Sequence, residues 1–228
     1  MATLHVCDSL HEANQLILSK LEPVLSVLNA KYTLALAGGN TPKALYREMS
    51  QKPWSWSNVQ VTLTDERWVS TDSADSNEKM INDCLLINEA KISYFLPLKN
   101  SATTASEGQQ ECETQLATLM PKLDGVILGM GDDGHIASIF PDLESTTTLL
   151  DRDSSALCMA ASPKDLPERM SLSLAYLLTA DHITILCSGK QKRLILDEVT
   201  QGKGSRYPVF HIVNQHSVPV DIYWSPAS

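Results

Sequence analysis

Residues 129–141 read G-M-G-D-D-G-H-I-A-S-I-F-P and place flexible backbone, two carboxylates and an imidazole between two apolar segments. Imidazole exchanges protons near neutral pH, and a neighbouring carboxylate can orient its ring. We therefore expect His135 to act as a general base and Asp133 to hold it in position. The glycines allow this loop to bend closely around a small ligand.

Two other interpretations of this loop stay open from the residues alone. A histidine is more often a surface or core residue than a catalyst. Asp132, Asp133 and His135 also offer ligands to a metal ion, but ligands so close in sequence rarely bind one ion without a distant partner. The histidines and cysteines do not have the spacing of a catalytic metal site. We therefore expect no metal.

A pair of glycines forms a second candidate site. Gly38 and Gly39 precede Asn40, Thr41 and Pro42 in the sequence G-G-N-T-P. Paired glycines let the backbone approach an anion, and a helix that starts here would direct its N–H groups toward that anion. Thr41 is placed to cap such a helix, and Pro42 suits its first turn. The segment predicts a phosphate site, and an ordinary capped turn is the alternative.

Charged residues follow other apolar runs. Asp65 and Arg67 lie in D-E-R-W-V, directly after one such run, and Lys190 follows another. Arg169 is expected to begin a helical stretch. Arginine and lysine bind phosphate oxygens through charge-assisted hydrogen bonds. Three cations at the ends of separate elements predict a local anion site, although each alone would be an ordinary solvated charge.

Alternating strand and helix patterns must position these residues. Apolar runs predict strands, and 3.6-residue periodicity predicts helices, with Pro23 expected to kink or divide the first helix. The predicted strands are the apolar part of 32–40, whose glycines form a tight turn, and 59–66, 93–98, 124–131, 155–160, 182–187, 209–213 and 221–224. The predicted helices are 8–30, 41–49, 76–86, 105–120, 167–179 and 191–200.

This alternation is typical of an α/β protein with a mostly parallel sheet and helices on both faces. The length of 228 residues and the hydrophobic content of 43% predict one domain over residues 1–228. Ligands of such folds bind at the carboxyl ends of the strands, where the residues named above are expected.

Composition argues against several classes of partner. Eighteen basic and 27 acidic residues give a net charge of −9, which repels nucleic acids and anionic membrane surfaces. No apolar stretch approaches the ~20 residues of a membrane span. Five scattered cysteines without a C-x-x-C pair or a secretory segment predict reduced thiols in a cytoplasmic protein. We find no sign of an obligate protein partner.

Five motifs in this order resemble those of the 6-phosphogluconolactonases, in the superfamily that includes glucosamine-6-phosphate deaminase. They are G-G-N-T-P at 38–42, D-E-R-W-V at 65–69 with S-N at 76–77, the loop at 129–141, S-P-K with P-E-R-M-S at 162–171, and S-G-K at 188–190. The chain departs from the family pattern at Asn40, at Ile136 and in Y-W-S-P-A-S, which lacks the usual acidic residue.

The resemblance implies a Rossmann-like fold of the glucosamine-6-phosphate deaminase/ribose-5-phosphate isomerase type. It implies hydrolysis of 6-phospho-D-glucono-1,5-lactone to 6-phospho-D-gluconate in the oxidative pentose phosphate pathway, without a cofactor. His135 would take a proton from water and return one to the departing ring oxygen, and Asp133 would orient it. The residues expected to bind the phosphorylated lactone are Gly38, Gly39, Asn40, Thr41, Asp65, Arg67, Arg169 and Lys190.

Two rival functions follow from the same superfamily. A glucosamine-6-phosphate deaminase would continue from the G-H pair toward F-N-E-P, whereas this chain has A-S-I-F-P with Phe140 and Pro141. A sugar-phosphate-binding regulator would keep the glycines and cations but would have no use for His135. Substitution of His135 therefore separates an enzyme from a regulator.

Overall fold

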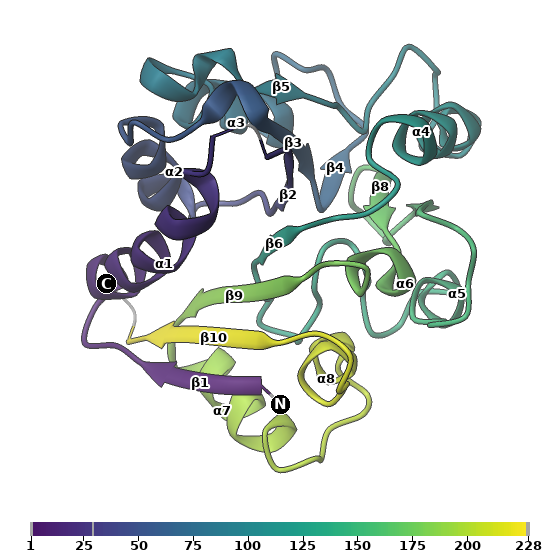
Figure 1. Ribbon diagram of the computed structural model, residues 1–228. Helices are drawn as coiled ribbons and strands as arrows, with labels where there is room; N and C mark the ends of the chain where they lie inside the picture. Colours follow the sequence, from purple (N-terminus) through teal and green to yellow (C-terminus); the bar gives the residue numbers. More distant parts are fainter. Residues whose placement is uncertain (1, 29, 227–228) are drawn as a thin grey trace.

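The computed structural model describes residues 2–28 and 30–226. Within these residues, parallel strands form a seven-stranded main sheet with the spatial order β1-β10-β9-β6-β2-β3-β5 (Figure 1). The strands are β1 Ala2–Val6, β2 Tyr32–Leu36, β3 Val59–Leu63, β5 Tyr94–Phe95, β6 Gly125–Leu128, β9 His182–Ser188 and β10 Val220–Ser225. The predicted α/β class with a mostly parallel sheet is confirmed.

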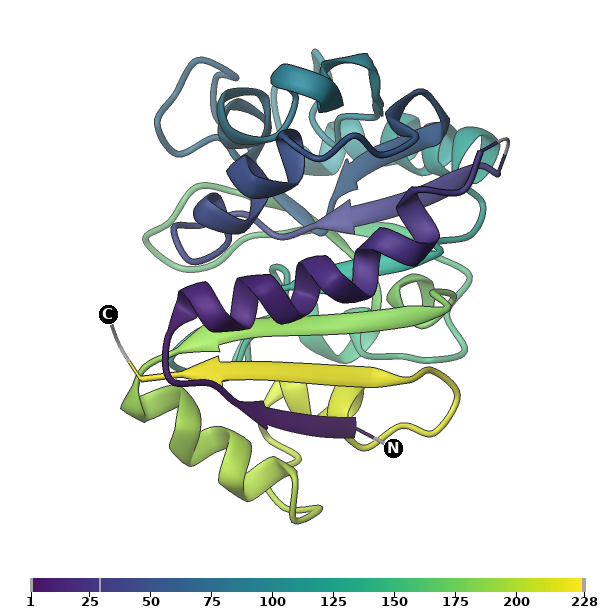
Figure 2. The ribbon, with the colours of Figure 1, turned by 60° about the vertical axis from the view of Figure 1, so that its left-hand side comes forward.

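Helices cover both faces of this sheet. Figures 1 and 2 show α1, α2 and α3 on one face and α7 and α8 on the other. The helices are α1 Leu10–Leu25, α2 Lys43–Ser50, α3 Asn77–Cys84, α4 Ala105–Leu119, α5 Thr146–Leu149, α6 Leu174–Leu177, α7 Lys190–Val199 and α8 Pro208–Val213, with 3-10 turns at Trp56–Asn58 and Asn88–Ile92. Among the described residues, none of these helices has the length and apolar character to cross a membrane.

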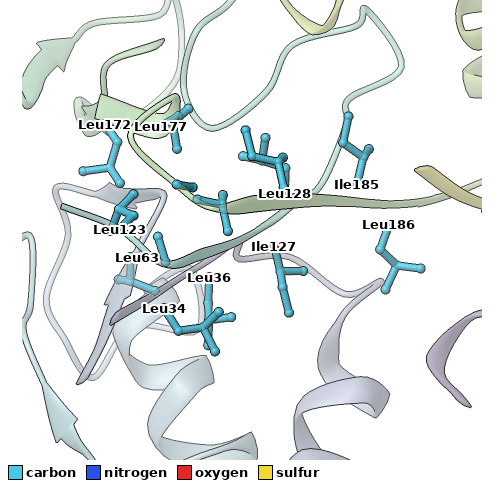
Figure 3. Packing of buried hydrophobic residues seen from close by; sticks show 14 of the residues in the cluster. Leu34, Leu36, Leu63, Leu123, Ile127, Leu128, Leu172, Leu177, Ile185 and Leu186 are labelled. Carbon is cyan, nitrogen blue, oxygen red and sulfur yellow. The ribbon is translucent and has the colours of Figure 1, made fainter. Parts of the chain in front are cut away.

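Side chains on both faces of the central strands are buried. Leu36 of β2 and Ile127 of β6 are register partners on one face, and Leu128 and Ile185 are partners on the other (Figure 3). All four side chains are at most 1% exposed. Strands buried on both faces read as continuous apolar runs, which is why the sequence located them.

A smaller antiparallel sheet stands beside the main one. Its strands are β4 Asp65–Arg67, β8 Arg169–Leu172 and β7 Cys158–Ala161, in that spatial order. The segment predicted as one strand at 59–66 is therefore two strands in two sheets. Thr64 joins them, because its N–H donates to Leu36 O at 2.9 Å and its carbonyl accepts from the N–H of Leu172 at 2.9 Å.

Two predicted elements are wrong. Residues 209–213 form α8 instead of a strand, because Pro208 occupies its first turn and a five-residue apolar run suits either element. Residues 167–179 contain strand β8 and only the short helix α6. The β8 backbone pairs with strands on both sides, and this pairing overrides the helical spacing.

The first helix also differs from its prediction. The chain begins with strand β1, and α1 then runs through Pro23 without interruption. Proline removes the hydrogen bond to the carbonyl four residues earlier, which here belongs to Ser19. Ser19 is exposed, so water can satisfy that carbonyl and the helix continues.

Candidate active site

A pocket of about 220 Å³ lies at the carboxyl ends of β2, β3, β6 and β9. The chain proceeds from β2 to β3 and β5 on one side, and from β6 to β9 and β10 on the other. The strand order therefore reverses between β2 and β6. Ligands of open α/β sheets bind at such a reversal, and the glycine segment and the histidine loop meet there. The lining residues include Gly38, Gly39, Asn40, Thr41, Asp65, Arg67, Asn77, His135, Ala137, Arg169 and Lys192.

The glycine segment follows β2 and leads into α2. Gly39 has φ +89°, a backbone conformation that favours glycine. The helix begins at Lys43, with Pro42 as its cap, and among the described residues no side chain caps it. The expectation that Thr41 caps this helix is therefore wrong. Its first turn also has no acidic side chain in the described structure, so its N–H end suits an anion.

The histidine loop follows β6 and is closed by its own hydrogen bonds. Gly131 N–H donates to His135 O at 2.9 Å, and Gly134 N–H donates to Gly131 O at 3.1 Å. His135 Nδ1 lies 2.6 Å from Asp133 Oδ1, which also accepts from the His135 backbone N–H at 3.1 Å. A carboxylate only accepts hydrogen bonds, so Nδ1 carries the proton and Nε2 is the basic nitrogen. Phe140 packs against the imidazole at 4.4 Å between ring centroids.

Asp133 remains ionised in this arrangement. Partial burial raises its pKa, but the hydrogen bond and charge of His135 and the backbone N–H donors together lower the pKa by more than burial raises it. The net result is a pKa below the ordinary value. The orienting carboxylate is therefore present at neutral pH, as a histidine held in one tautomer requires.

The small sheet carries two arginines into the pocket. Arg169 is the first residue of β8, not the start of a helix as predicted, and it pairs directly with Arg67 of β4. Arg67 Nη1 donates to Asp75 O at 2.6 Å, and Arg169 Nη1 lies 3.6 Å from Asp65 Oδ2. Burial lowers the pKa of Arg169, and the Asp65 carboxylate opposes that shift.

The predicted lysine is not in the pocket lining. Lys190 is exposed at the start of α7, whereas Lys192 lines the pocket and lies 3.9 Å from Asp132 Oδ1. Successive helical residues turn by about 100°, so side chains two positions apart point in nearly opposite directions. The sequence analysis missed Lys192 because it took the first cation after the strand.

Asn77 is a pocket-lining residue that the sequence analysis did not assign, and Ser138 is an unassigned buried neighbour of the pocket residue Asp65. Asn77 begins α3, lines the pocket and donates from Nδ2 to Asp65 O at 2.7 Å. Ser138 is buried three positions after His135. The S-N pair reads as an ordinary helix start, and a serine inside A-S-I-F carries no signal of its contacts.

A buried carboxylate joins α3 to β4. Glu66 accepts from the backbone N–H groups of Arg67, Asn77 and Glu78 at 2.7–2.8 Å and from the hydroxyl of Ser76 at 3.2 Å. Burial raises its pKa, and the backbone donors partly offset that rise. The carboxylate therefore fixes Asn77 relative to the arginine-bearing strand.

Known proteins share this sequence pattern and this arrangement. Residues 8–224 match the family described as Glucosamine-6-phosphate isomerases/6-phosphogluconolactonase. The chain belongs to this family. Curated members named 6-phosphogluconolactonase include one from Mesorhizobium japonicum, 35% identical over 85% of this chain and 81% of its own, and one from Neisseria meningitidis, 32% identical over 84% of each.

Solved structures agree with this assignment. A crystal structure of a 6-phosphogluconolactonase from Shewanella baltica is 32% identical and superposes with a TM-score of 0.92, covering 99% of this chain and 98% of that one. The resemblance to the 6-phosphogluconolactonases is thus confirmed. Among the described residues, no group of three or more histidine, cysteine, aspartate or glutamate side chains is arranged to hold a metal ion.

Proposed function

We propose that this chain is a 6-phosphogluconolactonase, a carboxylic ester hydrolase of the pentose phosphate pathway, with His135 as its general base. The observation that carries the catalytic part is the hydrogen bond of 2.6 Å between His135 Nδ1 and Asp133 Oδ1. It commits one ring nitrogen to a carboxylate and leaves Nε2 of a pocket-lining histidine to bind water. The named relatives support the choice of substrate.

The reaction needs one group that both accepts and returns a proton. Water attacks the lactone carbonyl carbon as Nε2 of His135 takes its proton, and the carbonyl oxygen becomes an oxyanion. The oxyanion then collapses, the bond from carbon to the ring oxygen breaks, and His135 returns the proton to that oxygen. Asp133 stabilises the imidazolium between these steps. The product is 6-phospho-D-gluconate, and atoms balance without a cofactor.

The substrate phosphate requires cations, and the pocket supplies three. Arg67, Arg169 and Lys192 line it together with Thr41. Charge-assisted hydrogen bonds from an arginine fork suit phosphate oxygens. We assign the phosphate to Arg169 and Lys192 near the glycine segment. Gly38, Gly39 and Asn40 border the sugar, and Lys192 takes the part predicted for Lys190.

The deciding experiment follows acid release from freshly prepared 6-phosphogluconolactone. Spontaneous hydrolysis is measured in parallel, because the lactone also opens without an enzyme. We expect release well above that background, and no acceleration over it would refute the function. Glucosamine 6-phosphate serves as the control substrate, and ammonia release from it would support the deaminase instead.

We also infer a cytoplasmic location. All five cysteines lie within the described residues as free, buried thiols. Free thiols persist in reducing compartments, which supports this inference. Fractionation of the source cells with an antibody to the chain tests it, and recovery from an oxidising compartment would contradict it.

A further inference from the structure

Four side chains of the small sheet share one face beside the pocket. Arg67 of β4 pairs with Arg169 of β8, and Asp65 pairs with Ser171. Residues two apart in a strand point to the same side, and so do directly opposed residues of an antiparallel pair. Two guanidinium groups therefore occupy directly opposed positions, where their like charges repel.

Ser138 covers this face from the loop that carries His135. Its N–H donates to Ser171 Oγ at 3.1 Å, and its hydroxyl donates to Asp65 Oδ2 at 2.6 Å. Arg169 Nη1 donates to the same hydroxyl at 3.5 Å. The residue has no exposed surface. One serine thus contacts three of the four side chains and joins them to the histidine loop.

These contacts hold the nearly buried guanidinium charge of Arg169 in place. The Arg169 side chain is 12% exposed and depends on Asp65 for its counter-charge. Its Nε is buried and has no hydrogen-bond partner within residues 2–28 and 30–226, so Asp65 and Ser138 provide the only hydrogen-bonding or ionic side-chain contacts of this guanidinium that these residues show. Without the Ser138 hydroxyl, Asp65 loses its shortest hydrogen bond, and both groups gain freedom to turn. Arg169 would then move under the repulsion of Arg67.

We propose that Ser138 is a positioning residue for the lactonase reaction. Its hydroxyl, acting through Asp65, fixes the guanidinium of Arg169 relative to His135, so that Arg169 meets the substrate phosphate while His135 activates the water that attacks the lactone carbonyl. The proposal rests on the proposed function and assigns Asp65 to hold Arg169. Ser138 itself does not touch the substrate.

The test is Ser138→Ala, which removes the hydroxyl and keeps the backbone N–H bond to Ser171. KM for the phosphorylated lactone should rise roughly ten-fold, the loss expected from about one charge-assisted hydrogen bond. Turnover should change less than about two-fold, because the histidine loop keeps its backbone anchor. Hydrolysis of unphosphorylated glucono-1,5-lactone should stay unchanged.

A matched control is Ser173→Ala. Ser173 is also a buried serine. It caps α6 and donates to Ala156 O at 2.6 Å, and it is not among the residues that line the pocket. Its loss should lower the unfolding temperature without a change in KM. Should Ser138→Ala fail to fold, Asp65→Asn is the second variant, because it keeps the acceptor and removes the charge that holds Arg169. It should raise KM in the same way.

A double-mutant cycle with Arg169→Ala decides the coupling. In the Arg169→Ala background, Ser138→Ala should have no further effect on KM. The same fold-change in both backgrounds, or an equal loss of turnover on both lactones, would overturn the proposal. The same cycle can be measured without turnover, by calorimetric titration of 6-phosphogluconate into the wild type, the two single variants and the double variant. An inactive wild-type chain would therefore refute the proposed function, while this coupling would still be measured.

Discussion

The amide of Asn77 fills the space that a side chain on Gly38 would need. A Cβ built on Gly38 would lie 1.9 Å from Asn77 Oδ1 and 2.2 Å from its Cγ. Asn77 has little room to retreat, because its Nδ2 donates to Asp65 O and its N–H donates to Glu66. The glycine is therefore required by close contact with the α3 terminus.

We expect Gly38→Ala to destabilise the fold by about 1–3 kcal/mol, the usual cost of overpacking a tight contact. It should also lower activity, because Asn77 lines the pocket together with Arg67 and Arg169. Urea unfolding and lactone assays measure the two effects. The control is Gly129→Ala in the same pocket, where the new Cβ would make an ordinary contact of 3.9 Å with Ala37. Equal stability losses in the two variants would contradict the steric argument.

His135→Ala should lower turnover by roughly 10²–10⁴-fold, the range typical of losing a positioned acid–base group. The fold should persist, because Gly131, Gly134 and the backbone of residue 135 keep their loop bonds. Circular dichroism and acid-release assays measure both. His11→Ala, at an exposed position, is the control and should retain full activity. A folded His135→Ala variant with normal turnover would support the regulator.

Sequence reasoning succeeded where periodicity and burial coincide. The central strands are apolar on both faces, so the sequence located them, although the predictions 59–66 and 124–131 run past the ends of β3 at Leu63 and β6 at Leu128. Gly38, Asp65 and His135 follow the central strands and line the pocket. Sequence reasoning failed where long-range pairing decides the structure. Residues around Arg169 have helical spacing, but β4 and β7 supply hydrogen bonds on both sides and make the segment a strand.

Residues that act through tertiary contacts carry no pattern of their own. Ser138 is important for the site because strands β4 and β8 arrive from distant parts of the chain. Lys192 differs from Lys190 only by its direction on α7, which depends on where that helix begins. The prediction of one domain over residues 1–228 stays a prediction.

Exhaustive chelation should leave the activity unchanged. The proposed mechanism uses His135 and Asp133 for proton transfer, and cations from arginine and lysine for charge. Activity after treatment with EDTA and dialysis measures this, with added zinc or magnesium as the control. Complete loss that one metal ion restores would replace the general-base mechanism with metal-activated water.

Lys192→Ala should weaken capture of the phosphorylated lactone, whereas Lys190→Ala should have little effect. Lys192 lines the pocket with its side chain 18% exposed, and Lys190 is an exposed residue of the same helix turn. A charge-assisted hydrogen bond contributes about 1.5–3 kcal/mol, so kcat/KM should fall roughly ten-fold to a hundred-fold for Lys192→Ala. Equal losses for both lysines would show a general electrostatic effect instead.

A charged cluster on the opposite end of the sheet from the pocket should make stability depend on pH. Asp221 of β10 is buried. Its carboxylate accepts a hydrogen bond from Nζ of Lys20 in α1, and its Oδ1 lies 2.6 Å from His5 Nε2. His182 Nε2 lies 3.1 Å from the other carboxylate oxygen. Burial raises the pKa of Asp221, but Lys20 and the histidines lower it to below its ordinary value. Burial lowers the pKa of His182 despite the attraction of Asp221.

Both shifts predict that acid weakens the fold. The folded state favours the neutral form of His182. Its contribution to stability is therefore fully present above the ordinary histidine pKa of about 6.5 and declines as pH falls below that value. Asp221 adds stability that is complete above about pH 4 and is lost as pH falls through its lowered pKa. Urea midpoints at pH 7.5, 5.5, 4 and 3 should therefore decrease in that order. Asp221→Asn should be less stable by about 1–3 kcal/mol at pH 7.5, since Lys20 loses its partner, and its decline below pH 4 should be shallower. A midpoint that rises on acidification, or an unchanged slope in Asp221→Asn, would show that other groups control the acid response.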